Sequence, residues 1–234
     1  DEVIAVYFIN RVQWQEHDDA LIKINFWLRN LELLQNKLEK LNIPLVVLEA
    51  DNYLDTASVL KDFCTENEVD NLYFNNEYPI NELERDRNIY SSFKENGIAV
   101  WTYHDQAIHE PGSLKTTTGN NFSVYSPFKR KWFAELLEDQ LLILDEPEKQ
   151  ENMCVEPTDL SKYLDEFAHQ KSELWPAGEE FIQNYIDEFL KFKGTTYKVK
   201  RNFPAIDATA KLSPYINAGI VSSKWCLLKA REYN

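Results

Sequence analysis

Short apolar runs and amphipathic segments alternate along the first hundred residues. The apolar runs are rich in β-branched and aromatic residues, which is typical of buried strands; they are residues 3–9, 45–48, 72–74 and 98–103. The segments between them repeat apolar positions every three or four residues, which predicts helices over 20–41, 56–67 and 81–96. Strict alternation predicts right-handed crossovers and an α/β fold, with a Rossmann-like parallel sheet covered on both faces.

The pattern changes after residue 105. Pro, Gly, Asn and Thr become frequent, a short helical signal follows up to residue 144, and an acidic, proline-punctuated stretch comes next. Helical periodicity resumes over 177–192, with Pro176 before it and acids in the first turn. We therefore expect an α/β domain over 1–106, a linker with short helices over 107–176 and the beginning of an all-α domain over 177–234.

Composition and cysteine usage narrow the class of protein. The 234 residues are 44% hydrophobic and 13% aromatic, enough for a globular core. No apolar run approaches the roughly 18 residues of a membrane span, and the chain opens with acids where a signal peptide needs a basic region. We expect a cytoplasmic protein with no membrane association. Cys64, Cys154 and Cys226 are far apart, which predicts reduced thiols and no zinc site.

Charge is distributed unevenly. From residue 191 onward nine Lys or Arg stand against two Asp or Glu, a balance of +7 in a chain with a net charge of −14, so the preceding residues carry −21. Residues 197–222 combine this basic charge with a tyrosine, hydroxyls and glycine, which favours a binding surface for a phosphate-bearing ligand over a core segment. On composition alone, a solvated charged helix is the stronger alternative.

Most common catalytic and nucleotide-binding motifs are missing. No strand is followed by GxGxxG, no serine lies in GxSxG, and the four histidines have no acid at a telling spacing. Glu82, Glu84 and Asp86 lie along one predicted helix, but their spacing spreads them over different faces. A solvated acidic helix is therefore favoured over a metal site.

Asn81 and Glu82 follow the third predicted strand, at the edge where ligands bind in open α/β sheets. An amide beside a carboxylate can pair with the edge of a planar heterocycle that carries adjacent N–H donors. The alternative, which geometry alone favours, is that Asn81 caps the helix and Glu82 complements its dipole.

Several motifs resemble the DNA photolyase and cryptochrome family in their order and spacing. In the last third they resemble the first part of its flavin-binding domain: WPAGE (175–179), YxxxR at Tyr197 and Arg201, Asn202, Pro204, TAKLSPYINAG (209–219) and Ser222. Upstream motifs resemble the antenna domain of class I cyclobutane pyrimidine dimer photolyases of the folate-binding type: QWQEH (13–17), IPL (43–45), NEYPINELERD (76–86) and YSPFKRKW (125–132). The resemblance covers essentially the whole chain.

The resemblance implies a flavoprotein that repairs UV-damaged DNA. The flavin adenine dinucleotide (FAD) site would include Tyr197 and the phosphate-wrapping residues Thr209, Ala210, Lys211, Leu212 and Ser213. Asn81, Glu82 and His17 would hold a 5,10-methenyltetrahydrofolate antenna. In the family, light absorbed by the folate reaches reduced flavin, which donates an electron to a flipped-out thymine dimer; the ring splits and the electron returns. The three predicted segments would be the antenna domain, the linker and the start of the FAD-binding domain of a monomer without metal.

The chain departs from the family pattern at several positions. Ala208 and Ala210 replace a glycine and a hydroxyl, Lys211 and Lys224 replace frequent arginines, and Ser223 stands where proline is common. The usual opening strand and the later flavin-clasping acids, DNA-binding arginines and electron-relay tryptophans are absent. We therefore expect a fragment that holds no catalytic residue and does not repair DNA alone. The alternatives are a cryptochrome-like light sensor without repair and a cofactor-free α/β interaction module.

Overall fold

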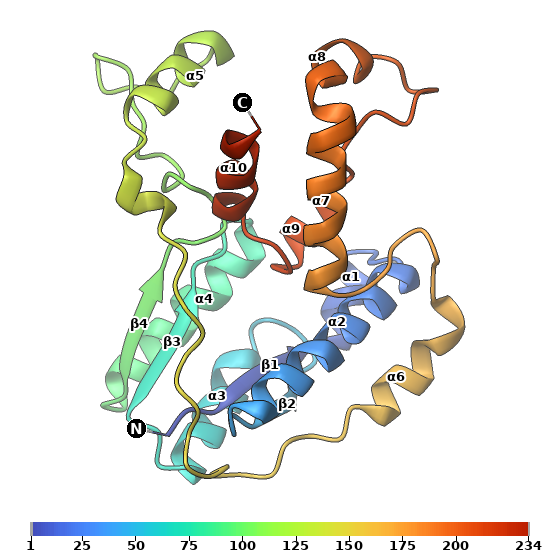
Figure 1. The fold of residues 1–234 in the computed structure, drawn as a ribbon. Coiled ribbons are helices and arrows are strands. Elements are labelled where there is room, and N and C mark those ends of the chain that lie inside the picture. Colours follow the sequence, from blue (N-terminus) through green and yellow to red (C-terminus); the bar gives the residue numbers. More distant parts are fainter. Residues whose placement is uncertain (1, 234) are drawn as a thin grey trace. The chain divides into compact units, whose positions relative to one another are not determined.

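The computed structural model describes residues 2–233, apart from the side chains of residues 138 and 139. The chain forms two compact units (Figure 1), one from residues 1–103 and 146–178 and the other from residues 104–145 and 179–234. The boundaries predicted at residues 106 and 176 divide the chain by the cofactor that each domain would bind, not by compactness. They therefore stay a prediction.

Four parallel strands form the centre of the first unit: β1 (Ala5–Ile9), β2 (Leu45–Glu49), β3 (Asn71–Asn75) and β4 (Ala99–Tyr103). Each strand predicted from an apolar run is present. β1 pairs in parallel with β2, and β3 pairs in parallel with β4. Among the described residues no ladder joins β1 to β3, so the strands make two two-stranded sheets instead of one continuous sheet.

The long helices of this unit are α2 (Leu21–Lys40), α3 (Thr56–Glu66) and α4 (Ile80–Glu95), which confirms the three predicted helices. The short helix α1 (Arg11–Glu16) was not predicted, whereas α6 (Ser161–Phe167) lies in the segment 107–176 that was expected to contain short helices; a 3-10 turn, η2 (Ala168–Gln170), follows α6.

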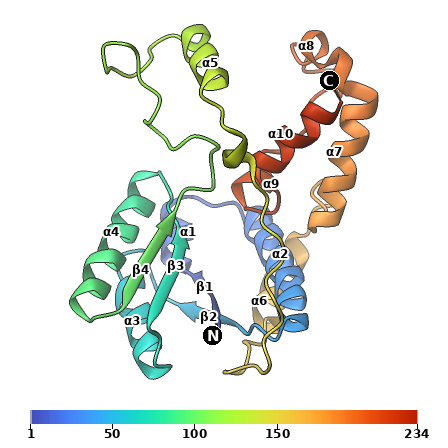
Figure 2. The ribbon, with the colours of Figure 1, turned by 60° about the vertical axis from the view of Figure 1, so that its left-hand side comes forward.

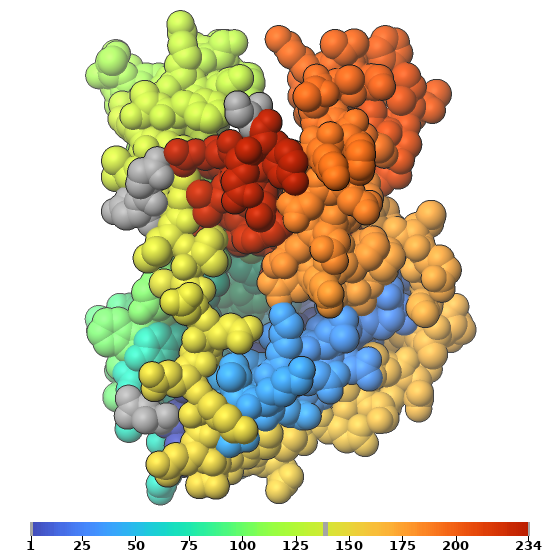
Figure 3. Space-filling model, in the orientation of Figure 1, coloured from blue at the N-terminus to red at the C-terminus, as the bar shows by residue number. Residues whose placement is uncertain are grey.

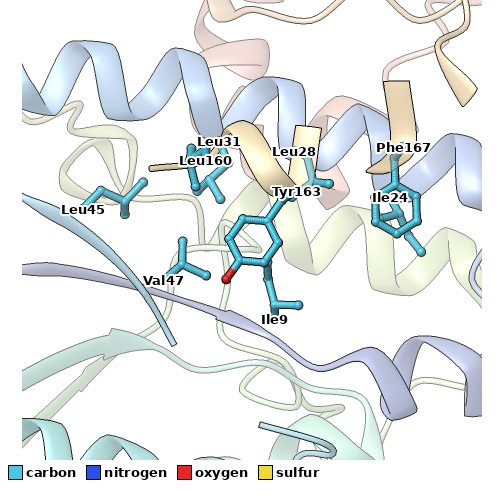
Figure 4. Close-up of a cluster of buried hydrophobic side chains, with 9 residues drawn as sticks. All are labelled: Ile9, Ile24, Leu28, Leu31, Leu45, Val47, Leu160, Tyr163 and Phe167. Carbon is cyan, nitrogen blue, oxygen red and sulfur yellow. The ribbon is translucent and has the colours of Figure 1, made fainter. Parts of the chain in front are cut away.

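A first hydrophobic cluster joins α2 and α6 to β1 and β2 (Figure 4). The ring of Tyr163 lies in its middle, and the Tyr163 hydroxyl donates to the carboxylate of Glu49 at the end of β2 (2.6 Å). The cluster comprises Ile9, Ile24, Leu28, Leu31, Leu45, Val47, Leu160, Tyr163 and Phe167. Residues from the predicted linker thus complete the core of the α/β unit.

Helices α3 and α4 lie beside the strands (Figure 2), and a second hydrophobic cluster joins these two helices to the sheets. Its buried residues come from these two helices, and side chains of all four strands pack against them: Val6, Phe8, Leu48, Leu72, Phe74 and Val100. The opposite face of β3–β4 carries the exposed rings of Tyr73, Trp101 and Tyr103. The prediction of a sheet covered on both faces is therefore wrong for β3–β4, since the cluster formed by α2 and α6 contains residues of β1 and β2 but none of β3 or β4.

The chain returns from the second unit across the surface of the first (Figure 3). The Gln150 amide donates to the carbonyl oxygen of Asn42 (2.8 Å). Further along, the backbone N–H of Thr158 donates to the carbonyl oxygen of Leu45 and the backbone N–H of Val47 donates to the Thr158 hydroxyl, both at 2.9 Å. Thr158 therefore continues the hydrogen bonding at the outer edge of β2.

The regular elements that the structure describes in the second unit are helices and 3-10 turns, joined by long loops. Its elements are α5 (Tyr125–Ala134), η1 (Glu138–Leu141), α7 (Glu179–Lys193), η3 (Gly194–Thr196), α8 (Tyr197–Lys200), α9 (Ser213–Asn217) and α10 (Ser223–Glu232). The amphipathic α7, predicted over 177–192, buries Ile182, Ile186 and Phe189. None of the described helices is long and apolar enough to cross a membrane.

Candidate functional site

The end of β1 is held in place by a buried amide. The Nδ2 group of Asn10 lies within hydrogen-bonding distance of the carbonyl oxygen of Ala50 (3.1 Å), the carbonyl oxygen of Asn52 (3.3 Å) and the hydroxyl of Thr56 (3.4 Å). These contacts tie the start of α1 to the loop after β2. The start of α1 and the β2–α3 loop therefore lie together at the carboxyl ends of the strands, where α4 also begins.

His17 and Asn81 meet at this edge, although 64 residues separate them. The Asn81 Nδ2 atom lies 2.9 Å from His17 Nε2, and the Gln13 Nε2 atom lies 2.9 Å from the same nitrogen. Helix α4 begins at Ile80 with Pro79 as its N-cap residue, and no side chain caps it. The alternative that Asn81 caps the helix is therefore wrong, because its side chain bonds His17.

Glu82 lies in the first turn of α4, near the ring of Tyr53. Burial raises the pKa of Tyr53 to about 12, and the negative charge of Glu82 is the next largest cause. The Arg85 guanidinium lies over the Tyr53 ring, 5.0 Å from its centroid. The site thus combines an aromatic surface with a carboxylate, an amide and an imidazole.

Behind the site, Arg85 forms an ion-pair network with Glu77 (2.7 Å) and Asp86 (2.7 Å). Asp86 is buried and also accepts from the backbone N–H of Glu77 (3.2 Å). Burial alone would lower the pKa of Arg85, but the charges of Asp86 and Glu77 outweigh it and raise that pKa. The prediction of a wholly solvated acidic helix is wrong for Asp86, because it is the buried partner of Arg85.

The candidate flavin residues lie in the second unit. Tyr197 opens α8, half-exposed, with its ring 5.9 Å from that of Phe189 at the end of α7. The Arg201 guanidinium lies 5.6 Å from the centroid of the Tyr197 ring. Tyr197 therefore presents part of its ring to solvent at the basic end of α7.

Residues 207–213 carry charge and hydroxyl groups on the surface. Asp207 bridges Lys193 (2.9 Å) and Lys211 (2.8 Å), and the hydrogen bonds from these lysines lower its pKa to about 2. Lys211 has a left-handed backbone (φ 49°), while Thr209 and Ser213 are exposed.

Parts of the segment 197–222 are core and not surface. Ala208, Tyr215 and Val221 are buried. Tyr215 packs against Phe181 of α7, with ring centroids 6.2 Å apart. The prediction that this run is surface and not core is therefore wrong for these three residues, and for Tyr215 the reason is its packing on α7.

Sequence reasoning missed Gln13, Tyr53 and Arg85 as members of the first site. Two of them lie within quoted motifs, Gln13 in QWQEH and Arg85 in NEYPINELERD. Tyr53 had no comparable signal, since it stands alone in a loop and reaches the site only through the fold.

A parallel α/β unit with a polar site at its strand ends, followed by a helical unit with a basic surface, defines the class of protein. The sequence model of the DNA photolyase family matches residues 1–150. The chain belongs to the DNA photolyase family.

Sequence similarity to curated relatives extends over almost the whole chain. The deoxyribodipyrimidine photo-lyase of Buchnera aphidicola subsp. Acyrthosiphon pisum is 30% identical over 97% of this chain and 47% of its own length. That of Vibrio cholerae is 27% identical over 100% of this chain and 50% of its own length. The chain thus spans about half the length of the curated relatives it matches.

Solved structures share the fold. A bacterial class III photolyase from Agrobacterium tumefaciens superposes with a TM-score of 0.76 at 24% identity, covering 98% of this chain and 47% of that one. A cryptochrome from Synechocystis sp. superposes with a TM-score of 0.72 at 16% identity, covering 99% and 50%.

Proposed function

We propose that this chain supplies the antenna domain and the first part of the FAD-binding domain of an enzyme that uses light to repair cyclobutane pyrimidine dimers in DNA. The names of the relatives support the reaction. The observation that carries the proposal is the contact between His17 and Asn81 beside Glu82, since all three are candidate antenna residues and the fold brings two of them within 2.9 Å.

At the strand-end site, Asn81 and Glu82 would hold the ring of a 5,10-methenyltetrahydrofolate, and His17 would hold Asn81 in place. The donor set fits, because an amide and a carboxylate suit the N–H groups on the edge of a pterin ring. When bound, the folate supplies absorption of near-ultraviolet and blue light. Tyr53 and Arg85 would shield one side of the site from water.

In the second unit, Tyr197 would contact FAD, and residues 209–213 would hold its phosphates. The exposed hydroxyls of Thr209 and Ser213 and the cations Lys193 and Lys211 fit a pyrophosphate. When bound and reduced, the flavin supplies the electron that splits the dimer. Here Asp207 opposes an anion, because it already pairs with both lysines.

Further parts of the proposal concern the whole protein. Its partner is UV-damaged DNA, it acts as a monomer in the cytoplasm, and its functional boundaries lie near residues 106 and 176. These follow from family membership and from the sequence patterns.

The antenna site is tested by replacing Glu82→Gln. Losing a charge-assisted hydrogen bond should weaken methenyltetrahydrofolate binding about 10- to 100-fold. The measurement is the folate absorption band that stays with the chain after gel filtration. Glu84→Gln is the matched control, because Glu84 is exposed on the same helix; equal retention by both variants would count against the site.

A light sensor without repair is the second candidate, and the structural likeness to a cryptochrome favours it. A longer protein that contains this sequence, loaded with both cofactors, should restore UV-irradiated DNA under blue light. Lesions that persist despite bound FAD would favour the sensor.

A cofactor-free interaction module is the third candidate, favoured by the exposed rings of Tyr73 and Trp101, which stack with centroids 6.4 Å apart. In that case neither FAD nor folate would remain with the longer protein after reconstitution.

A further inference from the structure

We propose that Gln13 is a positioning residue that acts through His17 to fix which end of the Asn81 amide faces the ligand. The ligand half of this inference rests on the proposed antenna function. The inference rests on three consecutive hydrogen bonds, which link the backbone N–H of Tyr53 to Gln13, Gln13 to His17, and His17 to the exposed side chain of Asn81.

The first bond fixes the orientation of Gln13. The backbone N–H of Tyr53 lies 3.2 Å from Gln13 Oε1, and a backbone N–H can only donate. The oxygen of the Gln13 amide must therefore face Tyr53. Since Gln13 is buried, with only 4% of its surface exposed, its amide has little freedom to turn over.

The second bond fixes the proton on His17. With its oxygen toward Tyr53, Gln13 presents its NH₂ group to His17 Nε2 at 2.9 Å. An amide NH₂ only donates, so this imidazole nitrogen must accept. His17 is then neutral and carries its proton on Nδ1. The ring is further oriented by Tyr53, which it meets edge to face at 5.8 Å.

The third bond fixes Asn81. Its amide also lies 2.9 Å from His17 Nε2, which already accepts from Gln13. If Asn81 presented its oxygen, two lone pairs would face each other, so Asn81 presents its NH₂ group and shares the acceptor. Asn81 Oδ1 is consequently left for the ligand.

The ligand therefore meets two acceptors in succession, Asn81 Oδ1 and the Glu82 carboxylate. This pair selects a planar ring with two or more adjacent N–H donors, such as an aminopyrimidine edge, and disfavours a ring edge made of acceptors. If the Asn81 amide were reversed, the same position would favour an alternating donor and acceptor edge. Gln13 would thus determine specificity without touching the ligand.

The chain without any ligand tests the relay directly. Nitrogen-15 NMR of labelled histidine should show His17 with Nδ1 protonated and Nε2 unprotonated at neutral pH. A proton on Nε2 would overturn the relay. No substitution is needed for this measurement, so a folding defect cannot obscure it.

Gln13→Glu and Gln15→Glu form a matched pair, because both add one negative charge to α1 but Gln15 is exposed. A carboxylate at position 13 cannot donate, so it should draw a proton onto His17 Nε2, whereas Gln15→Glu should leave the histidine spectrum unchanged. In the same pair, methenyltetrahydrofolate affinity should fall up to about 10-fold for Gln13→Glu alone, because the ligand loses its neutral hydrogen bond to Asn81 Oδ1. Equal affinity in both variants, with the unaltered chain binding, would overturn the inference. Failure of the unaltered chain to bind would instead overturn the antenna proposal and the part of this inference that concerns the ligand. The hydrogen-bond relay from Gln13 to Asn81 would still be tested by the NMR measurement of the His17 tautomer.

Discussion

Asp207 holds two of the cations that a flavin phosphate would need. It accepts from Lys193 and Lys211 at the surface, and both ion pairs are well exposed to solvent. Exposed pairs of this kind contribute at most about 1 kcal/mol each. The lysines are therefore oriented by Asp207 and can exchange it for a stronger anion.

Asp207→Asn should raise the affinity for FAD, because it removes a competing negative charge. We expect a gain of up to about fivefold, the equivalent of one exposed ion pair. Flavin fluorescence titration measures it. Asp165→Asn, an exposed acid on α6, serves as the control for net charge. Unchanged affinity in Asp207→Asn would show that the lysines do not face the phosphates.

Burial raises the pKa of three tyrosines, most strongly for Tyr7 and Tyr53. Burial, and next the charge of Glu77, raises the pKa of Tyr7 to about 12; burial, and next the charge of Glu82, does the same for Tyr53. A raised folded pKa contributes stability that is complete below the unfolded value of about 10 and is lost as the pH rises through the folded pKa. Stability should therefore fall between about pH 10 and about pH 12.

Tyrosinate absorbance and circular dichroism, followed together against pH, check this expectation. The last tyrosines to ionise should do so as the helical signal is lost, and Tyr53→Phe should remove part of that late absorbance change. Full ionisation of every tyrosine in a chain that stays folded would contradict it.

At the scale of single elements, Thr158 joins the returning chain to β2. It accepts from Val47 through its hydroxyl and donates to Leu45 through its backbone, and Gln35 of α2 donates to its carbonyl oxygen (2.9 Å). One residue therefore connects a strand edge, a long helix and the connecting segment.

Thr158→Val should destabilise the first unit by about 1–3 kcal/mol, because the Val47 N–H is left without an acceptor. Urea unfolding measures the change. Thr117→Val, in an exposed loop of the second unit, should have little effect. A similar loss in both variants would mean that the Thr158 hydroxyl makes no specific contribution.

Elements with several turns or strong β patterns were predictable, because their periodicity extends over enough residues. Helix α2 repeats its apolar positions over five turns, whereas α1 and α6 have only six and seven residues. The arrangement of the strand-end site was harder to predict: His17 and Asn81 were identified, but their contact depends on packing between α1 and α4. Burial of Asp86 depends on Arg85 in the same way, and no spacing rule reveals such a pairing.

At the scale of the whole molecule, charge governs contact with DNA. A net charge of −14 should make duplex binding by this chain weak. Two regions of the second unit are basic: the chain from residue 191 onward, and the face of α5 where Ser126, Lys129, Arg130 and Phe133 line a surface hollow.

Reversing Lys129→Glu and Arg130→Glu together should lower the remaining affinity and reduce the salt dependence by about one unit of slope for each lost phosphate contact. Fluorescence anisotropy with a labelled duplex at two salt concentrations measures both. Arg87→Glu with Lys94→Glu, an equal change on exposed residues of α4, is the control. Tight binding by the unaltered chain would contradict the expectation.

The first unit is built from two stretches of chain, with residues 104–145 between them. During synthesis, all four strands and α2 leave the ribosome before Tyr163 and Phe167, which complete their core. A nascent chain that has reached only β4 therefore lacks the part of the cluster over α2 that Leu160, Tyr163 and Phe167 supply. Chaperones that recognise exposed apolar surface can bind the nascent chain during this interval, which ends when α6 has been made and has packed against α2.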